Sequence, residues 1–306
     1  GWTRCGSGRR GFRRLGLGTL GCGSFVFGRG TCDVGRRGLG RSDTVALTRF
    51  MRPSIYKTPA ELRLMVQPGL ITAKALDAVR AAIAPGVTTL ELDAIAEREI
   101  RASGAEPNFL LEDGYHHTIC ASVNDDVVHG IPGDRVLRAG DIVSIDCGAV
   151  VNGWNGDAAF TVVIPDASAP ELVARRERLA RVTEHSLWAG IAALASARHL
   201  NEVGAAIEES IENEGTFGIL EEYAGHGIGR AMHEEPSVPN YRVRERGPRV
   251  KPGLVVAIEP MVTLGSAETF VRDDEWTVAT TDGSVAAHVE HSVAIHSGGI
   301  WVLTAA

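Results

Sequence analysis

The sequence carries one motif twice, and this repeat constrains the fold more than any other feature. The first copy is Leu137-Arg-Ala-Gly-Asp-Ile-Val-Ser-Ile-Asp146, and the second is Val250-Lys-Pro-Gly-Leu-Val-Val-Ala-Ile-Glu259. In each copy a glycine precedes a short run of β-branched residues, a pattern typical of a turn followed by a half-buried strand. We expect the acid that closes each copy to lie at the strand end. The repeat predicts a duplicated fold.

The residues on either side of the repeat are duplicated as well. A His-Gly-Ile triplet lies upstream of each copy, beginning at His129 and at His226, and a second acid lies downstream, Asp157 and Glu290 respectively. Two equivalent sets of acids and imidazoles predict a metal site on the pseudo-twofold axis between the two halves.

Length and composition indicate a globular protein without a membrane span. A chain of 306 residues can form one large domain or two, and the repeat favours one domain of two halves. Hydrophobic residues make up 44% of the sequence, yet no apolar run approaches the roughly 20 residues that a transmembrane helix needs. The five cysteines have irregular spacing that fits neither a disulfide framework nor a zinc knuckle, which favours a reducing compartment, the cytoplasm.

Residues 1–50 differ from the rest of the chain. They contain 13 glycines and ten arginines and carry a net charge of +8, which leaves −15 for residues 51–306. Such a composition cannot form a core. A targeting peptide, a basic arm for nucleic acid and translation from upstream of the true start are the alternatives. We favour the last, because the first methionine is Met51, and we expect residues 51–306 to form the functional domain.

Helices followed by strands in each half predict an α+β architecture. A helical pattern begins at Thr58, an N-cap with a capping-box glutamate, and continues to Ile83. Three further helices are expected, two of them ended by glycine: Leu90–Ser103 before Gly104, Leu172–Ala195, and Asn201–Asn213 before Gly215. Ile119–Val123 and Val127-Val128 resemble strands joined by a turn at Asn124-Asp125, which places His129 at a strand end.

Asn152-Gly153 is a strong hairpin signal. With these two residues as the turn, Gly148 faces Asp157, and Asp146 lies diagonally from Asp157 on the same face. Two acids so placed repel each other unless a cation lies between them. For one such pair a solvated polar face explains the pattern equally well, but Glu259 and Glu290 repeat the arrangement, and four equivalent acids favour the metal site.

Six other histidines lack this duplicated context. We expect them to be surface or hydrogen-bonded residues: His116, His117, His185, His199, His288 and His296. Four carboxylates and one imidazole make a hard, oxygen-rich site that suits manganese, iron(II) or cobalt(II) rather than structural zinc. Five side chains can serve two ions only if two acids bridge them, and such a centre activates water for hydrolysis.

Six motifs, in this order along residues 51–306, resemble those of type I methionine aminopeptidases, which are metallopeptidases of the pita-bread fold. The motifs are Val128-His-Gly-Ile-Pro132, Ile145-Asp146 with Gly156-Asp157, Gly225-His-Gly-Ile-Gly229 followed by Met232-His-Glu-Glu-Pro236, Ile258-Glu-Pro-Met261, Glu275-Trp-Thr277 and Val289-Glu-His-Ser292. The resemblance implies two pseudo-symmetric halves with a curved antiparallel sheet flanked by helices.

The resemblance also implies a role for each residue of the site. Asp157 and Glu290 would bridge two divalent ions of cobalt, manganese or iron(II), Asp146 would complete one ion, and His226 with Glu259 would complete the other. Glu259 would also act as general base, His129 would contact the scissile amide, and His233 would hydrogen-bond the oxyanion. The methionine pocket would be lined by apolar or soft side chains: Tyr115, Cys120, Met232, Trp276 and Phe109.

The activity implied by this resemblance is removal of the initiator methionine from nascent proteins whose second residue is small. It implies a cytoplasmic monomer that works at the ribosome, with no specific nucleic-acid binding and no membrane partner. Three positions depart from the family pattern and affect the pocket: Glu112, often aromatic in the family, His116, commonly proline, and Glu275, commonly glycine.

Two alternatives have the same fold. The first is a proline-directed peptidase of the prolidase or aminopeptidase P type, but such enzymes usually carry an additional N-terminal domain, which residues 1–57 cannot form. The second is a non-catalytic pita-bread module that binds proteins or nucleic acid. Such modules lose metal ligands, whereas all five are present here, and a charge of −15 opposes nonspecific nucleic-acid binding.

Overall fold

The structure is a computed structural model and describes residues 54–305, so the expectation for residues 1–50 lies outside the described residues. The α+β prediction is confirmed. The helices are α1 (Pro59–Leu64), α2 (Val66–Ala82), α3 (Thr89–Ala102), the 3-10 helix η1 (Phe109–Leu111), α4 (Pro170–Leu194) and α5 (Glu202–Glu214). The strands are β1 (Glu106–Pro107), β2 (Ile119–Val123), β3 (Asp126–Val128), β4 (Ile142–Val151), β5 (Trp154–Val163), β6 (Gly218–Ile219), β7 (Gly225–Gly227), β8 (Glu234–Val238), β9 (Val255–Ile258), β10 (Met261–Thr263), β11 (Thr269–Val271), β12 (Val278–Thr280), β13 (Ala286–His288), β14 (Glu290–His296) and β15 (Gly299–Val302).

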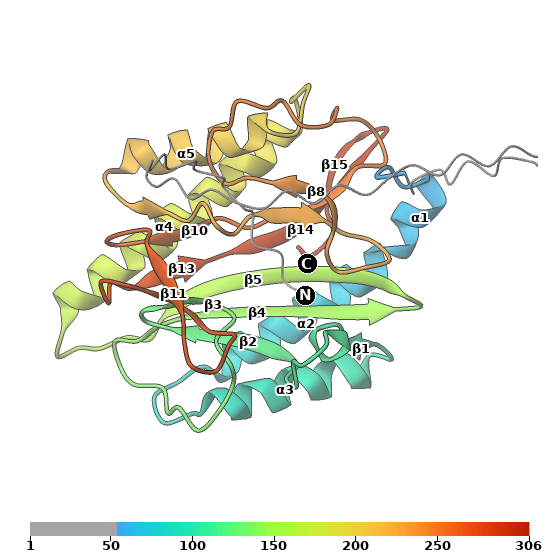
Figure 1. Ribbon diagram of the computed structural model, residues 1–306. Helices are drawn as coiled ribbons and strands as arrows, with labels where there is room; N and C mark the ends of the chain where they lie inside the picture. Colours follow the sequence, from blue (N-terminus) through green and yellow to red (C-terminus); the bar gives the residue numbers. More distant parts are fainter. Residues whose placement is uncertain (1–53, 306) are drawn as a thin grey trace, which may run out of the picture. The chain divides into compact units, whose positions relative to one another are not determined.

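The main sheet has the two-fold arrangement that the repeat predicts. Its strand order is β1-β4-β5-β14-β9-β7-β8, with β2 beside β4 and β15 beside β14. The β4–β5 pair of the first half therefore meets the β14–β9 pair of the second half in mirrored order, and β5 and β14 join the halves at the centre (Figure 1).

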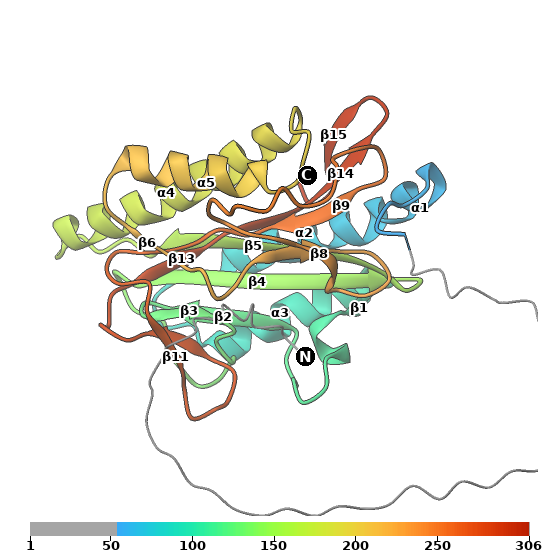
Figure 2. The same cartoon turned by 45° about the horizontal axis from the view of Figure 1, so that its top comes forward.

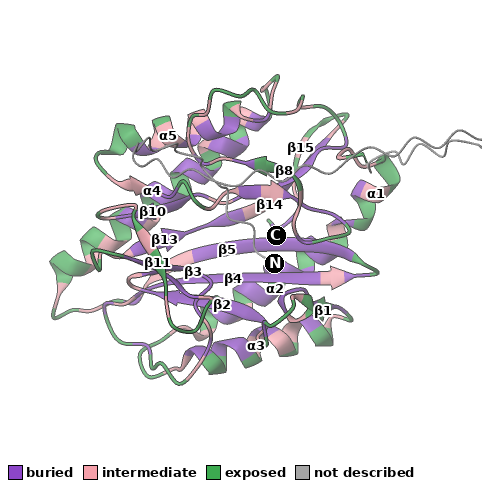
Figure 3. Ribbon diagram, viewed as in Figure 1, coloured by how far each residue is buried: buried purple, intermediate pink, exposed green. Residues whose placement is uncertain are grey.

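Two helix pairs cover one face of this sheet (Figures 1 and 2). Alternate residues of β4 point toward α2 and α3, because Val143, Ile145 and Cys147 share one buried core with residues of both helices. A second core joins α4 and α5 to β9 and β14. The strands at the centre of the sheet are buried almost throughout (Figure 3). The intervening residues of β4, including Asp146, point to the opposite face.

Local sequence explains where the helices begin and end. Thr58 and Glu61 form the expected capping box. The expected single helix up to Ile83 is wrong, however, because it is interrupted at Met65 between α1 and α2. Pro68 accounts for this break, since a proline lacks the N–H that would bond to the carbonyl of Leu64. The other three expected helices are confirmed to within two residues, with Gly215 ending α5.

The hairpin prediction is confirmed. Asn152 and Gly153 both have positive φ, 52° and 73°, as a two-residue hairpin turn of this type requires. Gly148 pairs with Asp157 in the expected register. The expectation that Asp146 closes its strand is wrong, because pairing with β5 extends β4 to Val151 and leaves Asp146 in mid-strand. Glu259 does follow β9 directly, as expected.

Two three-stranded sheets complete the part of the chain that the structure describes, β13-β10-β6 and β11-β12-β3. The expected turn at Asn124-Asp125 is present, and β3 continues from it to pair with β12. Arg272 supports this pairing, because its guanidinium lies 2.7 Å from carboxylate oxygens of both Asp125 and Asp126. Between residues 54 and 305, no helix is long and apolar enough to cross a membrane.

Candidate metal centre

The structure brings the predicted acids together in two overlapping groups. The ligand atoms of Asp157, His226 and Glu290 all lie within 4.8 Å of one another. Those of Glu259, His288 and Glu290 form a second group with the same spacing. Glu290 belongs to both groups, so the two groups share one carboxylate. Asp146 belongs to neither group, although burial and, to a smaller extent, the charge of Glu259 raise its pKa.

Burial makes this cluster electrostatically unfavourable in the absence of a cation. It raises the pKa of Asp146 and that of Glu259 to about 7. Burial and the charges of neighbouring acids raise the pKa of Asp157 and that of Glu290 well above the usual range. Carboxylates that share a desolvated space resist ionisation in this way, and a bound cation removes the penalty.

Several ligand atoms of the cluster are buried without a hydrogen-bond partner. These atoms are Asp146 Oδ1, Asp157 Oδ1 and Glu290 Oε1. An unpaired buried carboxylate oxygen costs free energy, and such atoms are rare in folded proteins unless an ion or water satisfies them. The donor set of oxygen with imidazole nitrogen therefore fits divalent metal ions.

His226 is oriented as a metal-ligating histidine would be. Its Nδ1 lies 3.0 Å from the carbonyl oxygen of Gly227 and donates to it, which directs Nε2 toward Glu259 Oε1 at 3.5 Å. Burial lowers the pKa of His226 to about 4, so the ring is neutral at pH 7. Gly227 is required beside it, because a Cβ there would lie 2.2 Å from the carbonyl oxygen of Glu235.

The other two predicted histidines border the cluster. The ring centroid of His233 lies 4.4 Å from that of His226, and burial lowers the pKa of His233 to about 4. His129 directly follows β3, as expected, with a positive φ of 59° and a pKa that burial lowers to about 3. Its ring packs edge-on against Tyr223. Both imidazoles are therefore neutral near pH 7.

The turn that carries His233 is fixed by an ion pair. The carboxylate of Glu234 accepts hydrogen bonds from the backbone N–H groups of Arg230 and Ala231. The Lys57 ammonium lies 2.6 Å from the same carboxylate, and the Lys57 side chain is only 6% exposed. Residues at the start of the described chain thus hold this turn of the site in place.

The predicted pocket residues lie together. Phe109, Tyr115, Cys120 and Met232 form one buried cluster, with Trp276 packed against it. The ring of Tyr115 meets that of Phe109 edge-on at 6.1 Å and that of Trp276 at 5.0 Å. The pocket adjoins the acids, because Cys120 is the direct cross-strand partner of Asp146. Ile131 also packs here and was not expected from the sequence.

Comparison with known proteins supplies the family. The sequence model for "Metallopeptidase family M24" matches residues 63–297. The chain belongs to the metallopeptidase family M24.

The sequence of this M24 family member is similar to known proteins along most of its length. It is 50% identical to methionine aminopeptidase 1 of Mycobacterium tuberculosis over 266 residues, which cover 85% of this chain and 98% of that protein. It is 45% identical to methionine aminopeptidase 1 of Bacillus subtilis, covering 82% and 98%. These matches confirm the resemblance inferred from the six motifs.

Solved structures agree with the sequence matches. The methionine aminopeptidase of Thermotoga maritima superposes with a TM-score of 0.76 at 38% identity and covers 82% of this chain and 99% of its own. The prolidase of Pyrococcus furiosus gives a TM-score of 0.62 at 22% identity, covering 82% and 66%, which shows a shared fold. The pita-bread prediction is confirmed by these M24 structures.

One expectation for this M24 site is wrong. His288 was expected to be a surface or hydrogen-bonded residue, yet it is 2% exposed and its Nε2 has no hydrogen-bond partner. Nε2 lies 3.5 Å from Glu259 Oε2. The only sequence signal for this residue was its position two before Glu290, where the period of an extended chain allows both side chains to share a face.

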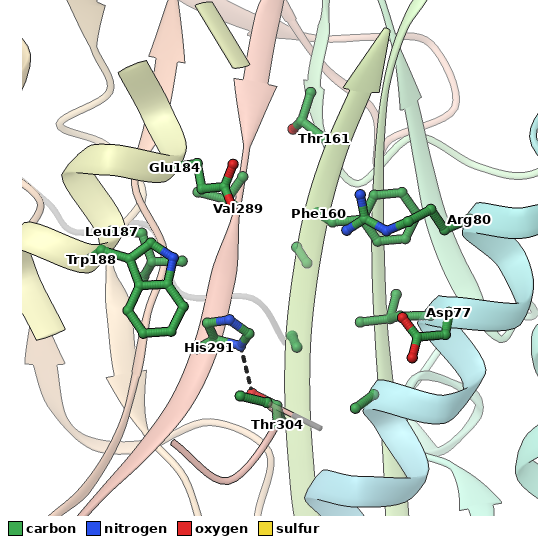
Figure 4. A pocket seen from close by; sticks show the side chains of 15 residues that line it. Asp77, Arg80, Phe160, Thr161, Glu184, Leu187, Trp188, Val289, His291 and Thr304 are labelled. Atoms are coloured by element: carbon green, nitrogen blue, oxygen red, sulfur yellow. Dashed lines mark hydrogen bonds between the residues drawn. The ribbon is translucent and has the colours of Figure 1, made fainter. Parts of the chain in front are cut away.

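A separate cavity lies behind the M24 site, on the helix-covered face of the sheet. It has a volume of about 250 Å³ and lies between α2 and α4 (Figure 4). Asp77 and Arg80 line one side, Trp188 lines the other, and His291 Nδ1 lies 2.9 Å from Thr304 Oγ1 at its centre. Since adjacent residues of a strand face opposite ways, His291 points into this cavity while Glu290 points to the acids.

Proposed function

We propose that this protein is a methionine aminopeptidase that removes the initiator methionine from nascent proteins when the second residue is small. One observation carries this proposal: the buried cluster of Phe109, Tyr115, Cys120, Met232 and Trp276 borders the acids through the Cys120–Asp146 strand pair. Soft and aromatic side chains match a thioether. The position of this pocket beside the metal centre favours cleavage after a single N-terminal methionine.

The acid cluster would hold two divalent ions, with cobalt, manganese and iron(II) all suited to its ligands. In the proposed arrangement Asp157 and Glu290 would be shared by both ions, Asp146 would help to hold one, and His226 with Glu259 would help to hold the other. The presence of Glu290 in both ligand groups supports its bridging role. Divalent ions bound here supply Lewis acidity, which lowers the pKa of a coordinated water and polarises a carbonyl.

The protein's own side chains would handle the proton and the oxyanion. Glu259, whose side chain is 12% exposed at the edge of the cluster, would accept a proton from water and pass it to the leaving amine. His233 is neutral at pH 7, and its N–H would stabilise the oxyanion. His129, also neutral, would contact the scissile amide.

We also propose that residues 51–306 form the catalytic domain and act as a monomer on nascent chains at the ribosome, in the cytoplasm. The metal-site acids and histidines, the pocket and the fold all lie within this part of the sequence. The charge of −15 outside residues 1–50 opposes nonspecific binding to ribosomal RNA, so we expect that the nascent N-terminus is recognised through the pocket.

Peptide specificity tests the proposal. Manganese-loaded protein is incubated with Met-Ala-Ser, Leu-Ala-Ser and Ala-Pro-Ser, and the released amino acids are quantified. We expect free methionine from the first peptide and little product from the other two. Preferred cleavage of Ala-Pro-Ser would indicate a proline-directed peptidase. Bound metal without cleavage of any peptide would indicate a non-catalytic binding module.

A further inference from the structure

His288 occupies a position with no role among the five ligands assigned above. It is the last residue of β13, and only Val289 separates it from Glu290. Its backbone N–H donates to the hydroxyls of Ser144 and Thr161, and its carbonyl accepts from Thr161 at 2.6 Å. These bonds attach its backbone to both β4 and β5, so the ring is held at a defined place beside the acids.

The surroundings of the His288 ring are those of a ligand. His288, Glu259 and Glu290 present ligand atoms within 4.8 Å of one another, and His288 Nε2 lies 3.5 Å from Glu259 Oε2. Donors that bind one ion at about 2.1 Å lie roughly 3–4 Å apart, so a small contraction suffices to close on a cation. The nitrogen is buried and has no hydrogen-bond partner, which is costly unless another group satisfies it.

A protein hydrogen bond does not explain the placement of Nε2. The nearest charged atom is Glu259 Oε2 at 3.5 Å, too far for a good hydrogen bond between a nitrogen and an oxygen. The same glutamate presents its other oxygen, Oε1, to His226 at 3.5 Å. Two imidazoles therefore approach Glu259 from two sides, each at a distance that leaves room for an ion.

We propose that His288 is a further metal ligand, which donates Nε2 to the ion held by Glu259 and Glu290. The inference rests on the proposed metal centre and deepens it. The centre would then contain two imidazoles rather than one. Because imidazole suits iron better than manganese, the second imidazole would move the metal preference of this protein away from manganese and toward iron(II).

Proton NMR of the cobalt(II)-loaded protein tests this proposal without an activity assay. Each histidine bound to cobalt(II) gives one strongly shifted, exchangeable N–H resonance, and labelling with ¹⁵N-histidine identifies these signals. We expect two such signals in the wild-type protein and one in His288→Gln. Glutamine keeps a polar end near the position of Nε2 but offers an amide in place of the imidazole. The affinity of the His288→Gln variant for cobalt(II) should fall roughly tenfold or more.

His291→Gln is the matched control. This imidazole lies three residues further along but faces the cavity behind the sheet, so its loss should leave both signals and the cobalt affinity unchanged. One shifted signal in a wild-type protein that binds cobalt would overturn the role of His288 alone and leave the proposed function intact. Failure of the wild-type protein to bind cobalt would overturn the metal centre as well. A single shifted signal in the wild-type protein is decisive even if His288→Gln does not fold.

Discussion

Asp146 and Glu290 lie in one row across the sheet, because each is the direct strand partner of Ala159. Neighbouring strands are about 4.8 Å apart, so the Cα atoms of the two acids are separated by roughly 10 Å with only a methyl group between them. Residues in register point to the same face. The small side chain of Ala159 therefore leaves open the space in which the acids converge.

We expect Ala159→Val to weaken metal binding although it removes no ligand. The added methyl groups would project into the space between Asp146 and Glu290, and manganese affinity measured by calorimetry should fall roughly tenfold or more. Ala158→Val is the control, since Ala158 packs in the core beneath α2. Its added methyl groups would point to the helix-covered face, away from the acids, so metal affinity should be retained. Equal metal affinity in both variants would show that Ala159 does not border the metal site between Asp146 and Glu290.

His233→Ala should separate catalysis from metal binding. If His233 bonds chiefly to the oxyanion, kcat on Met-Ala-Ser should fall by roughly 10² to 10³. KM should change little, because an interaction made only in the transition state does not affect ground-state binding. Metal content should remain native, as His233 lies in neither ligand group. Loss of bound metal in His233→Ala would show that His233 is a ligand, and an unchanged kcat would show that it has no catalytic role. The control is His185→Ala, which removes an exposed histidine on α4.

Glu275→Gly should stabilise the protein. Glu275 is exposed and has a φ of 65°, a conformation that favours glycine. Glycine is also the residue common at this position in the type I methionine aminopeptidases that the sequence resembles. The free energy gained by relieving this backbone strain should exceed the entropic cost of ordering a glycine on folding. The free energy of unfolding, measured by urea titration, should therefore rise by about 0.5–1 kcal/mol. Asp273→Gly, without a positive φ to relieve, should instead lower stability. A loss of stability in both variants would contradict this account.

Removal of residues 1–50 should leave melting temperature and turnover unchanged, whereas a chain beginning at Thr58 should melt several degrees lower. The difference lies in Tyr56 and Lys57. The Tyr56 hydroxyl donates to the carbonyl of Arg249, and Lys57 bonds to Gly253 through its backbone and to Glu234 through its side chain. A lower melting temperature on removal of residues 1–50 alone would show that they contribute to the fold.

Local signals explain what could be predicted from the sequence. The register of β4 against β5 followed from Asn152-Gly153, because a two-residue turn determines which residues face each other. Capping residues and terminal glycines predicted several helix ends, because a capping side chain bonds to free N–H groups at a helix start and glycine readily leaves the helical conformation. The duplicated motifs indicated which acids belong together, and the structure brings Asp157, Glu259 and Glu290 into two overlapping groups.

Long-range packing explains what was missed. The expectation of a strand end at Asp146 is an exception, because it conflicted with the local Asn152-Gly153 hairpin signal, whose strand pairing continues to Val151. His288 was not recognised because its placement depends on Ser144 and Thr161, which lie more than 120 residues earlier in the sequence. A histidine in an apolar segment looks the same whether it contacts a metal or only other side chains.

Methionine release measured against metal content tests the central claim most directly. The protein is stripped of metal with a chelator, manganese is returned in steps, and the initial rate of methionine release from Met-Ala-Ser is recorded at each step. We expect no release from the stripped protein and recovery that is complete by two equivalents, because in the proposed centre the acids would hold two ions that supply the Lewis acidity. Release that persists unchanged after metal removal would contradict the account.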